Sequence, residues 1–331
     1  MISYILKRLL YMIFTVWMLS VVVFIIIQLP PGDFLTTYIA SAQAQGTAVD
    51  QSQAETLRKA YGLDKSLPEQ YYLWFSKFIQ GDLGRSFQWQ FRPVSDLLAE
   101  RLPYTIMLSL LTLIFTYLIA VPIGIYAATH QYSFADYMLS VIGFIGLATP
   151  NFMLALILMY IMFKYFGLSV GGLFSQEYAN APWSLAKVED LARHMILPIL
   201  IIGLAGTAGI IRVMRGTLLD ELGKQYVITA RAKGVPEGKL LFRYPVRVAL
   251  NPIASTIGWQ LPRIISGETI TAIVLALPTT GPMLYQALIS QDMFMSGSIV
   301  MILGILTLIG TLISDILLVM VDPRIRFERK G

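Results

Sequence analysis

The chain has 331 residues, of which 56% are hydrophobic and only 14% are charged. Soluble domains carry about 25% charged residues, so the composition excludes an ordinary soluble fold and predicts an all-α integral membrane protein. Cysteine is absent, which excludes disulfides, thiolate nucleophiles and cysteine-based metal sites. The net charge of +5 falls in loops beside apolar stretches, a pattern of membrane topology rather than of nucleic-acid binding.

Six apolar stretches are long enough to cross a bilayer. A spanning helix needs about 20 mostly apolar residues to cross roughly 30 Å of hydrocarbon. The stretches of this length are Leu9–Leu29, Tyr104–Ala127, Met138–Phe166, Met195–Met214, Ala249–Leu277 and Ile299–Val321. The first could instead be a signal peptide, but its apolar run exceeds the roughly 7–15 residues of such a signal. We therefore predict six transmembrane helices.

Basic residues assign the two sides of the membrane, because cytoplasmic loops are enriched in Lys and Arg. The segment Arg212–Arg247 has eight basic and three acidic residues, and the tail Asp322–Gly331 has four basic and two acidic. The segment Pro30–Pro103 has seven basic and eight acidic residues, which suits an outside location. Both termini are therefore predicted to be cytoplasmic.

The predicted organisation follows the order of the chain. Residues 1–29 form the N-terminus and the first span, and residues 30–103 form an extracytoplasmic subdomain between the first two spans. Residues 104–321 contain the other five spans and a cytoplasmic loop at 215–247, and residues 322–331 form a cytoplasmic tail.

The outer segment is too long for a simple turn, so loop statistics predict that it has structure or function. Ala40–Ser52 is expected to be mobile, and Gln53–Gln80 is predicted to form two short helices broken at Gly62 and Pro68. The second helix has an apolar face, whose members are Tyr71, Trp74, Phe75 and Phe78. This face can pack on the spans, lie in the bilayer interface or form a platform for an extracytoplasmic partner.

The basic loop contains a predicted helix with a clear stop signal. Gln225–Lys233 has good helix formers, Gly234 follows directly, and Pro236 cannot extend the helix. A second helical piece is predicted over Lys239–Val248. The pair of helices can be a solvated loop that sets topology, or a docking surface for a soluble partner.

No motif predicts that the chain is itself an enzyme. The segment Gly234–Leu240 has three residues between its glycines where a phosphate-binding loop has four, and Leu240 stands where Ser or Thr would reach Mg²⁺. His130 and His194 lie far apart, without the spacing of metal ligands. We expect no catalytic residues, no metal site and no cofactor bound by this chain.

Three ionisable residues fall within the predicted spans: Arg263, Glu268 and Asp315. Charge in a membrane usually faces a bundle interior or an aqueous path. A structural ion pair, a substrate pathway and a coupling-proton site remain open. The last would make the chain a proton-driven secondary transporter, and a channel is a third class. Pro278 and Gly281 then interrupt the apolar pattern, as a segment lining a cavity would.

Short motifs occur in a fixed order along almost the whole chain. They are Leu57-Arg58, Gly62-Leu63-Asp64, Gln70-Tyr71 with Trp74, Gly81-Asp82-Leu83-Gly84-Arg85-Ser86, Arg101-Leu102-Pro103 with Thr105, Ala148-Thr149-Pro150, Leu197-Pro198, Tyr226 with Ala230-Arg231-Ala232-Lys233-Gly234, and Asp322-Pro323-Arg324. In this order and spacing the chain resembles permease subunits of binding-protein-dependent ABC importers. The resemblance is to the dipeptide/oligopeptide permease group, and within it to the first, B-type permease.

The candidate site residues form three sets, and the resemblance implies the role of the first. The loop that couples such permeases to a cytoplasmic ATPase comprises Tyr226, Thr229, Ala230, Arg231, Ala232, Lys233 and Gly234. The candidate pathway residues are Arg263, Glu268, Asp315, Pro278 and Gly281. The candidate contacts of an extracytoplasmic binding protein, at a scoop-like outer segment, are Trp74, Phe75, Asp82 and Arg85.

The resemblance also implies partners and a location. The partners are a second homologous permease in a heterodimer, two cytoplasmic ABC ATPases that bind ATP and Mg, an extracytoplasmic substrate-binding protein and the lipid bilayer of the bacterial inner membrane. The family often has Glu where Ala272 stands and Gly where Thr279 stands. These departures lie near the expected pathway, so a peptide, an oligosaccharide, an opine or nickel remains open as the substrate.

Overall fold

The computed structural model describes residues 2–29, 58–59, 62, 64–167, 170–267 and 269–321. Within these ranges the regular secondary structure is helical, with an isolated bridge between Arg85 and Pro93. It divides into two compact units. Unit 1 comprises Met1–Tyr104 and Thr279–Leu308, and unit 2 comprises Thr105–Pro278 and Ile309–Gly331. The predicted mobile stretch Ala40–Ser52 lies outside the described residues.

Unit 1 is built from helices near the two ends of the chain. They are α1 (Ile2–Gln28), α4 (Leu67–Ile79), α14 (Thr280–Ile289) and the adjoining parts of α5 (Val94–Thr129) and α15 (Met293–Val321). α4 begins after Ser66, whose amide and hydroxyl both donate to the Glu69 carboxylate, at 3.1 and 2.9 Å. Pro68 lies in the first turn, where its missing N–H costs nothing. Pro68 therefore starts this helix and does not break it.

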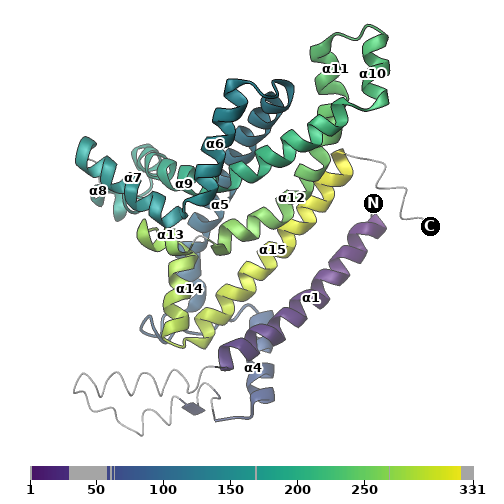
Figure 1. The fold of residues 1–331 in the computed structure, drawn as a ribbon. Coiled ribbons are helices and arrows are strands. Elements are labelled where there is room, and N and C mark those ends of the chain that lie inside the picture. The colour runs from purple at the N-terminus through teal and green to yellow at the C-terminus, as the bar shows by residue number, and fades with distance from the viewer. Residues whose placement is uncertain are drawn as a thin grey trace. The chain divides into compact units, whose positions relative to one another are not determined.

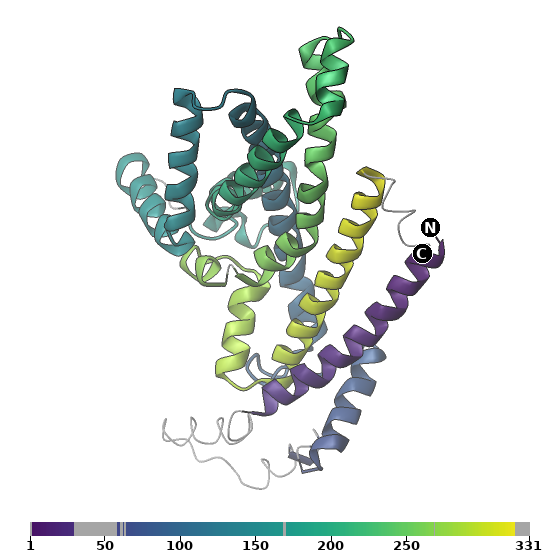
Figure 2. The same ribbon diagram turned by 45° about the vertical axis from the view of Figure 1, so that its right-hand side comes forward.

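The apolar face of α4 packs inward on α1, which lies alongside it (Figure 2). Trp74 is 5% exposed and its ring centroid lies 6.0 Å from that of Phe24. The Tyr71 hydroxyl shares a 2.9 Å hydrogen bond with Ser20. Packing on the spans, the first of the three interpretations, therefore describes this face. The Trp74 indole is enclosed in the unit's core, and its contact with a binding protein stays a prediction.

Unit 2 contains the remaining helices, together with residues 105–129 of α5 and residues 309–321 of α15. They are α6 (Phe134–Ala148), α7 (Asn151–Phe166), α8 (Gln176–Ala179), α9 (Leu185–Leu222), α10 (Gln225–Ala232), α11 (Glu237–Arg243), α12 (Pro245–Gly267) and α13 (Thr269–Val274). At about 1.5 Å per residue, α9 is nearly twice as long as the hydrocarbon layer is thick. It therefore continues well past the predicted span Met195–Met214.

Four helices in the described residues are long and apolar enough to cross a membrane. They are Arg8–Gln28, Val94–Thr129, Leu185–Leu222 and Met293–Ile316. The predicted span Met138–Phe166 is divided into α6 and α7, whose axes turn by 103°. The turn falls at Thr149, which is extended because it precedes Pro150. If this bent pair counts as one span, the described residues contain five.

Candidate functional site

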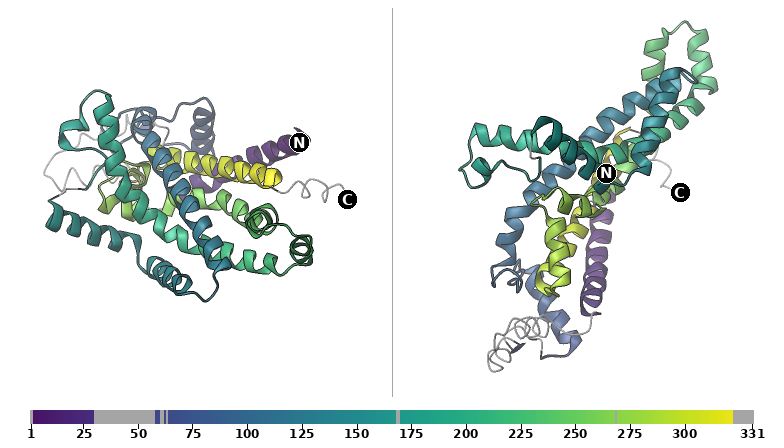
Figure 3. Two further views of the ribbon diagram at one scale, coloured as in Figure 1. Left: turned by 90° about the horizontal axis from the view of Figure 1, so that it is seen from above. Right: turned by 60° about the vertical axis from the view of Figure 1, so that its left-hand side comes forward.

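A helical hairpin formed by α10 and α11 projects beyond the ends of α9 and α12 (Figures 1 and 3). We call residues 210–222 of α9 and 245–253 of α12 the stem. The stem packs on the end of α5 through a buried core of Ala120, Ala128, Ile210, Met214, Leu218, Val246, Ala249 and Ile253. Gly124 permits this close approach, because a Cβ there would lie 2.6 Å from the Met214 Cβ.

The hairpin turns where the sequence predicts a helix stop. Gly234 has φ +74°, a conformation that glycine adopts without the steric cost of a side chain. Its amide donates to the Arg231 carbonyl at 3.0 Å, and the Val235 amide donates to the Ala230 carbonyl at 3.3 Å. The predicted end of the first helix is therefore confirmed. The second helix differs from the prediction, because α11 ends at Arg243 and Pro245 begins α12.

The hairpin has a small core of its own. Val227 and Leu240 are fully buried, Ala230 is 8% exposed, and Val235 and Tyr244 pack against them. These apolar residues hold the two short helices together, whereas Ile228 and Phe242 are 46% and 63% exposed. The other six predicted coupling residues are exposed: Tyr226, Thr229, Arg231, Ala232, Lys233 and Gly234. Ala230 contributes to the core and not to the outer face.

Two polar contacts fix the outer face of the hairpin. The Arg231 guanidinium donates to both oxygens of Glu237, at 2.5 and 3.2 Å. This hydrogen bonding lowers the pKa of Glu237 and raises that of Arg231. The Tyr226 hydroxyl donates to Glu221, and partial burial, with this acceptor, raises the pKa of the phenol. The exposed face therefore combines a fixed ion pair with a neutral phenol and a lysine.

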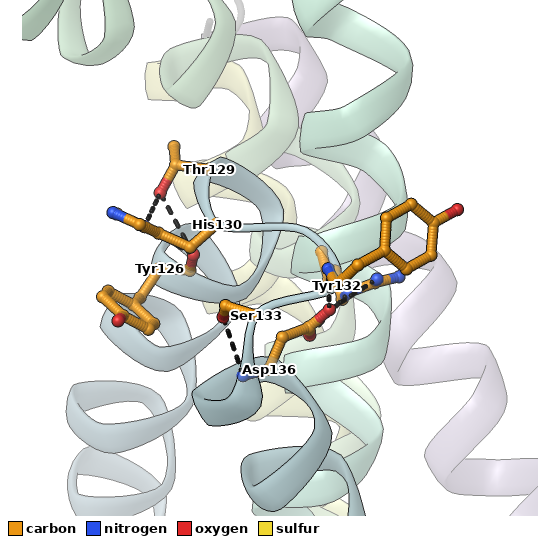
Figure 4. Close-up of polar contacts among 7 residues, drawn as sticks. Tyr126, Thr129, His130, Tyr132, Ser133 and Asp136 are labelled. Carbon is orange, nitrogen blue, oxygen red and sulfur yellow. Dashed lines mark hydrogen bonds and ion pairs between the residues drawn. The ribbon is translucent and has the colours of Figure 1, made fainter.

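An ion pair between α6 and the stem was not predicted from the sequence. Arg215 donates from Nε and Nη2 to the two oxygens of Asp136, at 3.0 and 2.9 Å. The Asp136 side chain is 4% exposed and also accepts from the Tyr132 amide at 3.1 Å. Ser133 caps the start of α6 by accepting from the Asp136 amide (Figure 4). Asp136 lies in the first turn of α6, 79 positions from Arg215, so no local pattern indicates the pair.

The outer signature Gly81–Ser86 has a structural role within unit 1. The Ser86 hydroxyl donates to the buried Asp292 carboxylate at 2.5 Å, and the Gln88 amide donates to the same oxygen at 3.1 Å. The other oxygen of Asp292 accepts from the Met295 amide in the first turn of α15. Asp292 therefore caps α15 and holds the loop in place. Burial outweighs these hydrogen bonds and raises the pKa of Asp292.

The remaining predicted residues are dispersed. Asp82 and Arg85 are exposed on the loop before α5, and Phe75 is half-buried beside Trp74. Pro278 follows α13, and Gly281 is buried in the first turn of α14.

The candidate pathway charges are described only in part. Arg263 lies on α12, Asp315 lies half-buried on α15, and Glu268 lies outside the described residues. Ala272, where the family often has Glu, is buried in α13. Across the described ranges, no three His, Asp or Glu side chains gather as metal ligands would.

The sequence matches two family models that together cover most of the chain. Residues 120–327 match the model described as binding-protein-dependent transport system inner membrane component. Residues 1–109 match the model of the N-terminal part of such membrane components.

Full-length relatives carry transport names. The oligopeptide transport system permease protein AppB of Bacillus subtilis (strain 168) is 33% identical over 99% of this chain and 100% of that protein. The corresponding protein OppB of Haemophilus influenzae is 30% identical over 99% of this chain and 100% of its own length. The glutathione transport system permease protein GsiC of Escherichia coli O6:H1 is 28% identical over the same shares.

A solved structure shares the fold. A chain of the MetNI methionine ABC transporter, solved in inward-facing conformations, superposes with a TM-score of 0.52 at 18% sequence identity. The match covers 68% of this chain and 96% of that chain.

Proposed function

Because the chain belongs to the family of binding-protein-dependent transport system inner membrane components, we propose that it forms half of the translocation pathway of an ABC importer for peptides. The observation that carries the proposal is the hairpin of α10 and α11. Val227, Ala230 and Leu240 are closed into a core, while Tyr226, Arg231 and Lys233 remain exposed beyond the stem, as do the apolar Ile228 and Phe242. Such a face suits a soluble partner.

The proposed assembly contains four further subunits. A second, homologous permease supplies the other half of the pathway, and two cytoplasmic ATPases bind ATP and Mg. A substrate-binding protein delivers the solute from outside. ATP binding closes the ATPase pair, the hairpin moves with the ATPase that holds it, and the spans alternate between inward and outward opening. No residue of this chain hydrolyses ATP.

We also propose the predicted six-span topology, with both termini in the cytoplasm of a bacterial inner membrane. α12 and α13 together supply the fifth span, and the bent pair α6–α7 supplies the third. Residues 30–103 form the outer subdomain, with Asp82 and Arg85 as exposed contacts for the binding protein. This orientation puts the hairpin on the ATPase side, in agreement with the excess of basic residues in Arg212–Arg247.

The hairpin proposal is tested by substitutions at two glycines. Gly234→Pro forces a negative φ where the residue has φ +74° and removes the amide bonded to Arg231. ATP-driven uptake in proteoliposomes, together with co-purification of the ATPases, is expected to be lost. Gly238→Ala is the matched control, because a Cβ there meets no atom within 4 Å. Arg231→Glu should act like Gly234→Pro while leaving membrane insertion intact.

Two results would contradict the proposal. Unchanged ATP-driven uptake in both the Gly234→Pro and Arg231→Glu variants would exclude the hairpin as the coupling element. Wild-type uptake that needs a proton gradient and no ATPase would indicate a secondary transporter instead.

Peptides are proposed as the solute class, because relatives that cover the whole chain are named as oligopeptide and glutathione permeases. Mass spectrometry of ligands retained by the cognate binding protein tests this assignment. Short peptides are expected in the retained fraction, whereas a retained oligosaccharide, opine or nickel complex would replace the peptide assignment.

A further inference from the structure

We propose that α6 and the stem move as one rigid body during transport, and that the Asp136–Arg215 ion pair is the positioning contact that fixes them together. This proposal rests on the proposed function, in which an ATPase moves the hairpin. It assigns Asp136 and Arg215 a role in transmitting that movement into the membrane.

The geometry of the ion pair constrains direction as well as distance. Arg215 uses two nitrogens on the two oxygens of one carboxylate, at 3.0 and 2.9 Å. A planar fork of this kind holds both groups in a single orientation. Asp136 is 4% exposed on its side chain, so solvent screens the pair little. The exposed pair of Glu189 and Arg193, 64% and 74% exposed at the other end of α9, lacks this enclosure.

A second set of contacts continues along the same two helices. A Cβ on Gly143 would lie 3.5 Å from the Ala208 Cβ, and one on Gly146 would lie 3.8 Å from the Leu204 carbonyl oxygen. Small residues let helix backbones approach closely in a membrane. From Asp136 to Gly146, positions rise along α6 while their partners fall along α9. The two helices are therefore attached over roughly 15 Å, at about 1.5 Å per residue.

These attachments define a route for movement. α9 ends at Leu222 and α10 begins at Gln225, so a displaced hairpin displaces the end of α9. The end of α5 follows through the stem core, and α6 follows through Asp136 and the glycine contacts. α6 is the first half of the bent pair, which leaves the turn at Thr149-Pro150 to absorb the change of angle toward α7.

A reversible crosslink tests the rigid-body part. The chain has no cysteine, so Gly143→Cys/Ala208→Cys introduces a single pair whose Cβ spacing matches the roughly 3.5–4.5 Å of a disulfide. The oxidised protein is expected to keep ATP-driven uptake within about twofold of the reduced protein, as rigidly attached helices should. Uptake that is lost on oxidation and regained on reduction overturns the proposal. Failure of the disulfide to form also overturns it, because the helices would not be adjacent.

Substitutions test the ion pair as a positioning contact. In complexes that still contain the ATPases, Asp136→Asn and Arg215→Gln are expected to lower the solute transported per ATP hydrolysed by roughly tenfold, within the range of coupling between distant sites. The exchange Asp136→Arg/Arg215→Asp should regain part of this ratio, and the control Glu189→Gln should leave it unchanged. A merely structural role would lower the amount of complex and not the ratio.

The outcomes separate this proposal from the proposed function. Unchanged ratios in both single variants overturn the role of the ion pair while leaving the permease assignment intact. A wild-type chain that takes up no solute when its ATPases hydrolyse ATP overturns both. If the single variants fail to insert, the crosslink in the otherwise wild-type chain still decides whether α6 and α9 move together.

Discussion

At the scale of single residues, carboxylates hold two arginine side chains in place. Arg231 and Glu237 meet across the turn of the hairpin, six positions apart, and Arg215 reaches an aspartate 79 positions away. The first pair lies within a segment whose basic character is evident from the sequence. The second could not be predicted, because a contact between distant helices leaves no local spacing to detect.

The Arg231–Glu237 pair predicts a pH dependence of the hairpin. The pKa of Glu237 is lower in the folded hairpin than its ordinary value of 4.5, chiefly through the hydrogen bond from Arg231. As the pH falls, Glu237 is therefore protonated first in the unfolded hairpin. The contribution of the pair to the stability of the hairpin is complete above pH 4.5 and is lost as the pH falls through the lowered pKa. Arg231 stays charged throughout.

Hydrogen exchange of the amides in α10 and α11, corrected for intrinsic rate, measures this effect. Protection in the wild-type chain is expected to be constant above pH 4.5 and to fall below it. Glu237→Gln should abolish this dependence. Equal pH profiles for the two chains would show that the ion pair does not stabilise the hairpin.

At the scale of elements, stop signals in the sequence predict helix ends better than helix starts. Gly234 ends α10 as predicted, because its backbone conformation favours glycine. The start of α12 was not predicted, since Pro245 falls inside a run of basic and apolar residues that reads as one helix. The break before Pro150 had a signal in the residue that precedes proline, but length and hydropathy alone predicted one continuous span.

Alanine substitutions at two glycines of the outer signature distinguish the cost of backbone strain from the cost of a steric clash. Gly81 and Gly84 have φ +82° and +76°. A Cβ on Gly81 would meet no atom within 4 Å, whereas a Cβ on Gly84 would lie 2.5 Å from Cδ1 of the buried Phe294 ring. Gly81→Ala should cost about 1–2 kcal/mol for the left-handed conformation. Gly84→Ala should cost roughly 1–3 kcal/mol more for overpacking.

Thermal unfolding of the purified variants compares these costs. Gly84→Ala is expected to lower the midpoint clearly more than Gly81→Ala does. If both variants unfold at the same temperature, Phe294 does not confine the loop.

At the scale of the whole molecule, composition predicts a membrane protein and charge predicts its orientation, but the number of spans is harder to read. Four helices meet the length and hydropathy criteria by themselves. α6 and α7, which are divided at Thr149-Pro150, are each too short to meet the length criterion alone, with 15 and 16 residues. α12 has 23 residues but is not apolar enough to meet the hydropathy criterion. Motifs distributed over the entire chain, rather than any one element, carried the prediction of the family.

Single cysteines test the proposed topology, since the chain provides a background without cysteine. Ser95→Cys on the exposed start of α5 should react with an impermeant maleimide added outside intact cells. Lys233→Cys on the hairpin should react only after the cytoplasmic face is opened. Both side chains are exposed, so access to the reagent and not burial decides the result. Labelling of both positions from the same side would contradict an odd number of crossings between them.

In the hairpin, the residues that stabilise the fold are different from the residues of the exposed face. Val227, Ala230 and Leu240 stabilise the fold of the hairpin without drawing on the exposed face. In the proposed assembly, substitutions on that face therefore change which ATPase is recognised at little cost in folding. By this route a duplicated gene acquires a new ATPase partner through a few exposed side chains, and its transmembrane helices do not have to change with them.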